Sequence, residues 1–321
     1  MGIRPGYKMG HHFTYMTHFT PHSCEIPLTT DIYQICDQYQ AVLLDAYGVL
    51  VHSRGAMPGA VDLIQHFNDH GKPFRVVTND SSRLPAQCSQ RYQQLGLQIQ
   101  PEQVITSGSL LIPWFRERGL QGCRTVVLGP ADSRRYVELA GGEVVPATSD
   151  LFDVLVICDQ SGFDFISTLD TLLTTLVHLV EGGRPPQLVL TNPDLIYPSG
   201  AGSFGYTSGA AALLLEAALQ LRFPGVDCPH FHRLGKPYVP IFNQAFVDLG
   251  TRQVVMVGDQ LVTDIAGARA AGIDSVLVGT GVVTPHVELT GPITPTWVVP
   301  DLTSFRPPAP HSKAPPGPQD I

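Results

Sequence analysis

Three short apolar runs, each followed by a polar residue, constrain the fold of this chain most strongly. They read AVLLD at 41–45, FRVVTN at 74–79 and VVMVGD at 254–259. Runs that are apolar throughout are typical of strands buried on both faces, as in parallel sheets. Amphipathic segments lie between them, so the alternation predicts an α/β fold with a doubly wound parallel sheet.

The polar residues that end these runs are expected to form one site. In an open parallel sheet, ligands bind in the crevice outside the carboxyl ends of the strands. Asp45, Thr78, Asn79 and Asp259 should therefore converge there, although they are far apart in the sequence.

Composition and charge argue against several classes of function. The net charge is −8, and the 20 Lys and Arg residues form no basic stripe, which argues against nucleic acid as a partner. The six cysteines form no CxxC pair, so neither a zinc site nor a disulfide framework is indicated and a reducing cytoplasm is expected. No stretch approaches the roughly 20 apolar residues of a membrane span, and no signal peptide is apparent.

Four segments in chain order resemble the signature motifs of the haloacid dehalogenase (HAD) superfamily. They are LLDAYGVL with Asp45, VVTNDSS, RLGKPYVPIF with Lys236, and MVGDQLVTDIAGA with Asp259 and Asp264. The resemblance extends over roughly residues 41–282. The long interval between the second and third motifs, with PGA and LTNPDLIYP, is similar to subfamily IIA, the nitrophenylphosphatase and phosphoglycolate phosphatase type, in which a large α/β cap is inserted there.

The resemblance implies a HAD core interrupted by an α/β cap. The expected parts are an N-terminal extension (1–30), a core (31–82 and 233–300), a cap (83–232) and a proline-rich tail (301–321). Apolar cap segments such as VLVIC and LVLTN indicate that the cap has a sheet and core of its own. In relatives of this type the cap determines the substrate and often mediates a homodimer.

The resemblance and the charge of phosphate together assign catalytic roles. A phosphate dianion repels a nucleophile, so cations and hydrogen-bond donors must surround it before Asp45 can attack phosphorus. Lys236 is expected to bring positive charge. The Thr78 hydroxyl and the Asn79 amide are expected to donate to the phosphate oxygens, and the substrate is expected to be a small phosphorylated molecule.

Magnesium is the cofactor that the resemblance implies. Asp45 and Asp259, each at the end of a strand, could supply the hard oxygen ligands that Mg²⁺ prefers. The backbone carbonyl of Tyr47 would complete the protein ligands, as the corresponding position does in the family. Asp264 is better placed to orient Lys236 than to bind the metal.

Tyr47 departs from the pattern of the phosphatases. Their residue two positions after the nucleophile is a second Asp, which protonates the leaving oxygen and later activates water. An ordinary phenol has a pKa of about 10, so it can donate a proton but is a poor base at neutral pH. Slow turnover is therefore expected, more so for alkyl than for aryl phosphates, unless His52 takes part of the role.

Three alternatives remain open. The first is a Mg²⁺-dependent phosphatase, and the second is a catalytically degenerate scaffold that binds a phosphorylated ligand or a partner. The third is a 2-haloacid dehalogenase, because DAYG also resembles the first motif of those enzymes. The residues between Asp45 and Asn79 leave no room for the cap that dehalogenases insert there. Asn192 and Asp194 in TNPD resemble a family element, but an Asx turn before Pro193 would explain them equally well.

Overall fold

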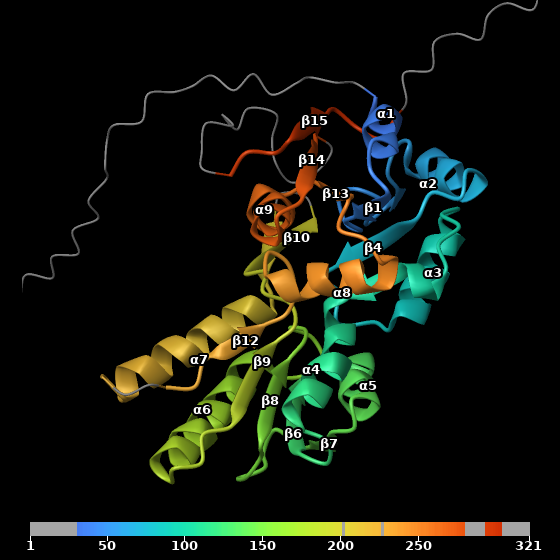
Figure 1. Ribbon diagram of the computed structural model, residues 1–321. Coiled ribbons are helices and arrows are strands. Elements are labelled where there is room, and N and C mark those ends of the chain that lie inside the picture. Colours follow the sequence, from blue (N-terminus) through green and yellow to red (C-terminus); the bar gives the residue numbers. More distant parts are fainter. Residues whose placement is uncertain (1–30, 201–202, 226–227, 280–292, 304–321) are drawn as a thin grey trace, which may run out of the picture.

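Two parallel sheets organise the computed structural model, which describes residues 31–200, 203–225, 228–279 and 293–303 (Figure 1). The predicted N-terminal extension and most of the proline-rich tail lie outside the described residues. Among the residues that the structure describes, no helix is long and apolar enough to cross a membrane.

The larger sheet has six strands, and each strand is parallel to its neighbours. In spatial order they are β15 (Trp297–Val299), β14 (Asp274–Val278), β13 (Val254–Gly258), β1 (Ala41–Leu44), β4 (Phe74–Thr78) and β5 (Val104–Thr106). All three apolar runs that predicted strands lie in the centre of this sheet, as β1, β4 and β13.

Helices cover both faces of the six-stranded sheet. The bounds of these helices are α1 (Ile32–Asp37), α2 (Ala60–Asp69), α3 (Pro85–Gln94), α8 (Val239–Leu249) and α9 (Ala266–Ala271). Val42 and Leu44 pack in one hydrophobic cluster with α1, α2 and α3, whereas Ala41 and Leu43 pack in another with α8 and α9. Alternate residues of β1 are thus buried on opposite faces, which is why the run is apolar throughout.

The smaller sheet belongs to the inserted cap and is also parallel. Its strands are β12 (Phe231–Arg233), β9 (Gln187–Leu190), β8 (Val154–Ile157), β6 (Arg124–Leu128) and β7 (Glu143–Val145), in that spatial order. The helices around it are α4 (Leu111–Arg118), α5 (Ala131–Leu139), α6 (Phe165–Glu181) and α7 (Ser208–Arg222). Helices α6 and α7 cover one face, and α4 and α5 pack against the other.

Short elements complete the described fold. Two antiparallel hairpins pair β2 (Val51–His52) with β3 (Gly55–Ala56) and β10 (Ile196–Gly200) with β11 (Ser203–Tyr206). Two 3-10 turns span Pro101–Gln103 and Ser107–Leu110, and a π-helical turn spans Leu261–Ile265.

The predicted fold class, a doubly wound α/β core with an inserted α/β cap, is confirmed, but the core extends further along the chain than residue 82. Strand β5 pairs with β4 in the core sheet, although it falls within the range 83–232 that was predicted for the cap. The cap sheet begins only with β6. The sequence does not mark this boundary, because the helix–strand alternation has the same pattern in the core and in the cap.

Two helices that flank the core sheet differ from regular amphipathic helices in detail. In α2, Leu63, Ile64 and Phe67 are buried, whereas Val61 is exposed. The segment after β13 begins as a π-helical turn and becomes α9 only at Ala266. It ends at Gly272, which adopts the left-handed conformation with φ +71°.

Candidate active site

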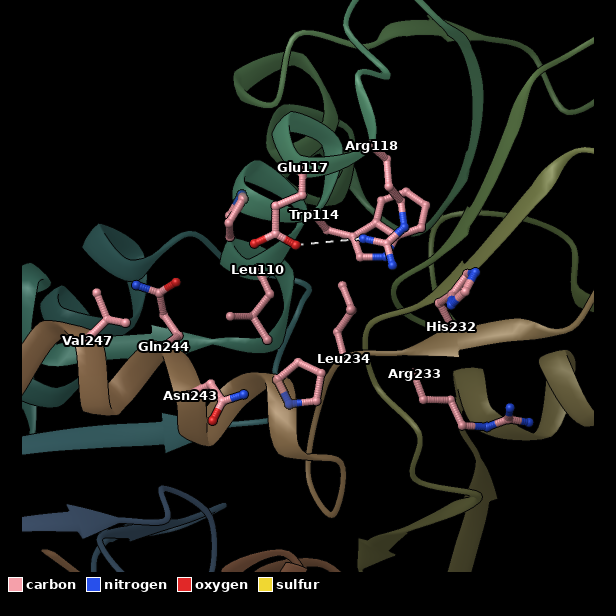
Figure 2. Close-up of a pocket in the computed structure, with 12 residues that line it drawn as sticks. Leu110, Trp114, Glu117, Arg118, His232, Arg233, Leu234, Asn243, Gln244 and Val247 are labelled. Atoms are coloured by element: carbon pink, nitrogen blue, oxygen red, sulfur yellow. Dashed lines mark ion pairs between the residues drawn. The ribbon is translucent and has the colours of Figure 1, made fainter. Parts of the chain in front are cut away.

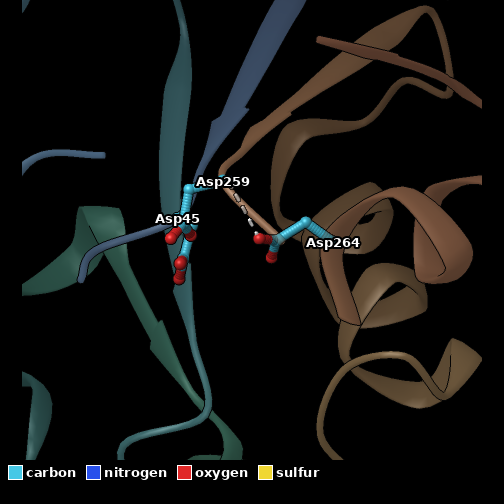
Figure 3. Close-up of side chains that lie close together, drawn as sticks. All are labelled: Asp45, Asp259 and Asp264. Carbon is cyan, nitrogen blue, oxygen red and sulfur yellow. Dashed lines mark hydrogen bonds between the residues drawn. The ribbon is translucent and has the colours of Figure 1, made fainter. Parts of the chain in front are cut away.

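Asp45 and Asp259 meet because the strands that precede them are neighbours. β1 pairs in parallel with β13, and the backbone N–H of Asp45 donates to the carbonyl of Val257 at 2.9 Å. Asp264, from the π-helical turn after β13, completes a buried group of three carboxylates (Figure 3). One oxygen from each lies within 4.8 Å of the others. Convergence at the carboxyl ends of the strands was the main prediction from the sequence, and the structure agrees with it.

Nearby backbone groups fix the positions of the Asp259 and Asp264 carboxylates. The backbone N–H groups of Asp259 and Gln260 donate to Asp264 Oδ2 at 3.2 and 3.1 Å. Gly48 has φ +94°, and a Cβ built on it would lie only 2.3 Å from Asp259 Oδ2. A side chain at Gly48 would therefore displace the carboxylate of Asp259, in addition to straining the backbone.

Lys236 lies between two of the three carboxylates. It follows β12 in the loop before α8, and its ammonium donates to Asp45 Oδ1 at 2.5 Å and to Asp264 Oδ1 at 2.7 Å. The residue is only 2% exposed. Burial lowers the pKa of Lys236, but Asp264 and Asp45 outweigh burial and raise it above its usual value. The lysine therefore stays charged beside Asp45, and its contact with Asp264 is the one that the sequence predicted.

Asn79 clamps the loop that carries Lys236. Its side-chain oxygen accepts from the backbone N–H of Lys236 at 2.7 Å. Its amide nitrogen donates to the Lys236 carbonyl at 2.9 Å and to Asp194 Oδ1 at 3.0 Å. Both amide hydrogens are thus engaged, so donation to phosphate would require one of these bonds to be exchanged. Thr78 lies beside it, and its hydroxyl accepts from the N–H of Asp80 at 3.2 Å.

A pocket of about 300 Å³ lies over this cluster and is lined by Asp45, Tyr47, Thr78, Asn79 and Lys236, among others. The Tyr47 side chain is 39% exposed there, so the phenol is accessible to a bound molecule. The structure thus brings most of the predicted site residues into one cavity.

His52 is not among the lining residues of the pocket. Its ring Nδ1 accepts from the N–H of Arg54 at 2.7 Å. Two arginines, Arg83 and Arg91, do line the pocket, and sequence reasoning missed both. Arg83 directly follows the second motif, which is a usable signal, whereas nothing in the sequence marks the side of α3 that carries Arg91.

Asp194 takes part in an Asx turn and also contacts another residue of the site. Its backbone N–H donates to Asn192 Oδ1 at 3.0 Å, which is the expected Asx turn, and its carboxylate also accepts from Asn79. Burial raises the pKa of Asp194 to about 6, against the opposing effects of Lys236 and Asn79. The segment therefore supports the clamp on the Lys236 loop and lines the pocket.

The residues present fit a divalent metal ion. Asp45 and Asp259 supply hard carboxylate oxygens, which suit Mg²⁺, Ca²⁺ or Mn²⁺. Both oxygens of the third carboxylate, Asp264, already accept hydrogen bonds from Lys236 and from the backbone. Only one lysine compensates the three carboxylates in the cluster, so a bound dication would balance the remaining charge. The pocket above the cluster leaves access for a ligand from solvent.

A second cavity, of about 350 Å³, lies between α4, β12 and α8 and shares no lining residue with the first (Figure 2). Trp114, Arg118 and His232 are among the residues that line it. The Arg118 guanidinium lies 4.6 Å from the centroid of the Trp114 ring and 3.8 Å from Glu117. Its charge is therefore already engaged.

Replacing Lys236 with methionine is expected to lower the free energy of unfolding by about 3–5 kcal/mol, because it leaves the Asp45 and Asp264 carboxylates buried without their cation. Urea denaturation in the presence of a chelator measures this effect without compensation by metal. Arg135→Met is the control, because it breaks only an exposed ion pair with Glu138, worth about 0–1 kcal/mol. If both variants lost the same free energy of unfolding, Lys236 would not be needed to compensate the buried carboxylates.

Two family models match the chain. The first, described as haloacid dehalogenase-like hydrolase, matches residues 42–143, and a second, HAD-hydrolase-like model matches residues 233–305. Together they include all four motifs and leave out most of the cap.

Curated relatives match most of the chain. The dihydroxyacetone phosphatase of Corynebacterium glutamicum is 29% identical over 80% of this chain and 87% of its own length. The acid sugar phosphatase of Staphylococcus aureus is 28% identical, over 83% of this chain and 96% of its own.

Solved structures agree in fold. A possible sugar phosphatase of the HAD superfamily from Cytophaga hutchinsonii superposes with a TM-score of 0.74, at 27% identity, over 86% of this chain and 98% of its own. A glycerol phosphate phosphatase from Mycobacterium tuberculosis, solved in complex with calcium, has a TM-score of 0.68 and 25% identity, over 84% of this chain and 75% of its own.

The order of the four motifs, the buried carboxylates around Lys236 and the matches to both parts of the core lead to the same assignment. The chain belongs to the haloacid dehalogenase-like hydrolases.

Proposed function

We propose that this protein is a Mg²⁺-dependent phosphatase of small phosphorylated metabolites that acts through an aspartyl-phosphate on Asp45. One observation carries the proposal: the Lys236 ammonium lies between Asp45 and Asp264, with Asp259 beside them, under an open pocket. The relatives named for dihydroxyacetone, sugar and glycerol phosphates support the class of substrate.

In the first half of the reaction, Asp45 attacks phosphorus and the bond to the leaving oxygen breaks. Lys236 already carries its proton beside the nucleophile, so its positive charge needs no rearrangement as the phosphate enters. Thr78 lines the pocket and offers a hydroxyl to a phosphate oxygen. Asp45, Asp259 and the Tyr47 carbonyl would hold Mg²⁺, which supplies further positive charge against the phosphate oxygens.

Asp264 and Asn79 act through Lys236 in this proposal. Asp264 accepts a second hydrogen bond from the ammonium that also donates to Asp45, and Asn79 fixes the backbone of Lys236. Together they hold the Lys236 ammonium in a fixed position beside the nucleophile, as the displacement requires.

Proton transfer is the step that the chain is least equipped to perform. A phenol in place of the usual second Asp can donate a proton to the leaving oxygen, but it is a poor base for the water that must attack the aspartyl-phosphate. We therefore expect hydrolysis of the intermediate to limit turnover. The second candidate function is a scaffold that binds phosphorylated ligands without turnover. An exposed phenol at position 47 is compatible with that function, because binding alone needs no proton transfer.

The dehalogenase alternative has weaker support. A dehalogenase attacks carbon and uses no metal. It would therefore not need the two further buried carboxylates near Asp45.

A homodimer formed through the cap, as in relatives of this type, stays a prediction.

Release of p-nitrophenol from p-nitrophenyl phosphate tests the proposal, because this leaving group needs little protonation. We expect many equivalents per protein with Mg²⁺, a loss of release with chelator and recovery when Mg²⁺ is restored. Release of one equivalent and no more would indicate that the reaction stops at the aspartyl-phosphate. No release at all, with phosphate binding intact, would favour the scaffold.

A further inference from the structure

The pocket over Asp45 contains three cations, and two of them are already paired. Lys236 is held by Asp45 and Asp264, and Arg83 forms an ion pair with Asp80 at 3.0 Å. The third, Arg91, makes no ion pair or hydrogen bond within the part of the chain that the structure describes, although it lines the same pocket. Its charge is thus available to a ligand.

Helix α3 places Arg91 on the side that lines the pocket. Tyr92, the next residue, is buried and also lines the pocket. Burial raises the pKa of Tyr92, Cys88, Asp80 and Asp45 raise it further, and Arg91 lowers it. Asp45 and Arg91 line the same pocket, so a small ligand that fills it can contact both.

An arginine that is half-buried and unpaired is suited to a particular kind of ligand group. Its planar guanidinium donates two parallel hydrogen bonds to a carboxylate or a phosphate, and the interaction is strong where water is partly excluded. Lys236 cannot serve this purpose, because the reacting phosphate needs it. Dihydroxyacetone phosphate and glycerol phosphate have no second anionic group that would use Arg91.

We propose that Arg91 selects phosphate monoesters whose organic part carries a second anionic group, a carboxylate or a second phosphate. This inference rests on the proposed phosphatase function and names the substrate class of the same pocket. The volume of about 300 Å³ is at the small end for ligand sites, which favours a compact carbon skeleton. Arg91 binds the far end of the substrate while the phosphate at its other end lies against Asp45 and Lys236.

The test compares substrates that differ only in the second charge. 3-Phosphoglycerate and glycerol 3-phosphate share a three-carbon skeleton, and fructose 1,6-bisphosphate and fructose 6-phosphate differ by one phosphate. Wild-type kcat/KM should favour the doubly anionic member of at least one pair, and the pair that responds distinguishes carboxylate from phosphate. In Arg91→Gln this preference should fall about 10- to 100-fold, mainly through KM, as expected for loss of a charge-assisted hydrogen bond.

Two further variants separate charge from structure. Arg91→Lys keeps the charge without the planar fork, so it should retain an intermediate preference. Arg135→Gln, on the exposed surface of α5, should leave the preference unchanged. The proposal would be overturned if Arg91→Gln weakened both members of each pair equally, or if wild type showed no preference in either pair.

Calorimetric binding to Asp45→Asn keeps the inference testable if the proposed function fails. That variant needs no turnover, so the affinities for 3-phosphoglycerate and glycerol 3-phosphate can be compared directly, with and without Arg91→Gln. Absence of p-nitrophenyl phosphate hydrolysis combined with an Arg91-dependent preference in binding would reject the phosphatase and keep the inference. Hydrolysis of p-nitrophenyl phosphate without an Arg91-dependent preference would support the phosphatase and reject the inference about Arg91.

Discussion

Replacing Asp45 with asparagine is expected to reduce phosphatase turnover by about 10⁵- to 10⁶-fold, the scale on which enzymes lose activity without their nucleophile. The amide oxygen of asparagine can still accept a hydrogen bond from Lys236, but it is neutral and a poor nucleophile towards phosphorus. The variant keeps the volume of the side chain, so the pocket should still admit substrate. Steady-state hydrolysis of p-nitrophenyl phosphate with saturating Mg²⁺ measures the loss.

Two controls make the Asp45→Asn result specific. Asp62→Asn, on the exposed surface of α2, makes the same chemical change away from the pocket and should leave kcat within about twofold, as is usual for surface substitutions. Thermal unfolding of Asp45→Asn shows whether the altered charge balance has changed stability instead. Retention of a tenth or more of the activity by a folded Asp45→Asn would mean that Asp45 is not the nucleophile.

The convergence of Asp45 and Asp259 was predictable because it depends on topology. Once the apolar runs are assigned to parallel strands, Asp45 and Asp259 must follow the same edge of the sheet, whatever the packing around them. Spacing along the chain also brings Asp264 back towards the end of β13. The π-helical turn that achieves this was not predicted, since its sequence also reads as the start of an ordinary helix.

Contacts between distant loops were not predictable. Asn79 and Lys236 are 157 positions apart, and nothing in either segment indicates that the amide of one would be engaged by the backbone of the other. Arg91 was missed for a similar reason. A helix in this fold can present a polar residue to solvent or to the pocket, and only the packing of α3 decides between them.

Replacing Tyr47 with aspartate is expected to raise kcat for glycerol 3-phosphate by about 10²- to 10⁴-fold, the usual contribution of a positioned acid/base. The leaving group of this substrate is an alkoxide, which needs a proton, and the aspartyl-phosphate then needs a base to activate water. Asp45, Lys236 and Asp259 are already arranged for the displacement itself. In the proposed mechanism, the change therefore supplies a carboxylate that can act as both acid and base, which the phenol does poorly.

The comparison of leaving groups separates proton transfer from other effects of Tyr47→Asp. p-Nitrophenolate leaves without protonation, so its release should gain only from faster hydrolysis of the intermediate, and a single-turnover measurement of the first step should change little. Tyr47→Asn removes the same ring without adding an acid or a base. If Tyr47→Asn raised kcat as much as Tyr47→Asp, the phenol would be acting as a steric block on a site that obtains its protons elsewhere. If only Tyr47→Asp gained, the tyrosine would be what limits hydrolysis in the natural chain.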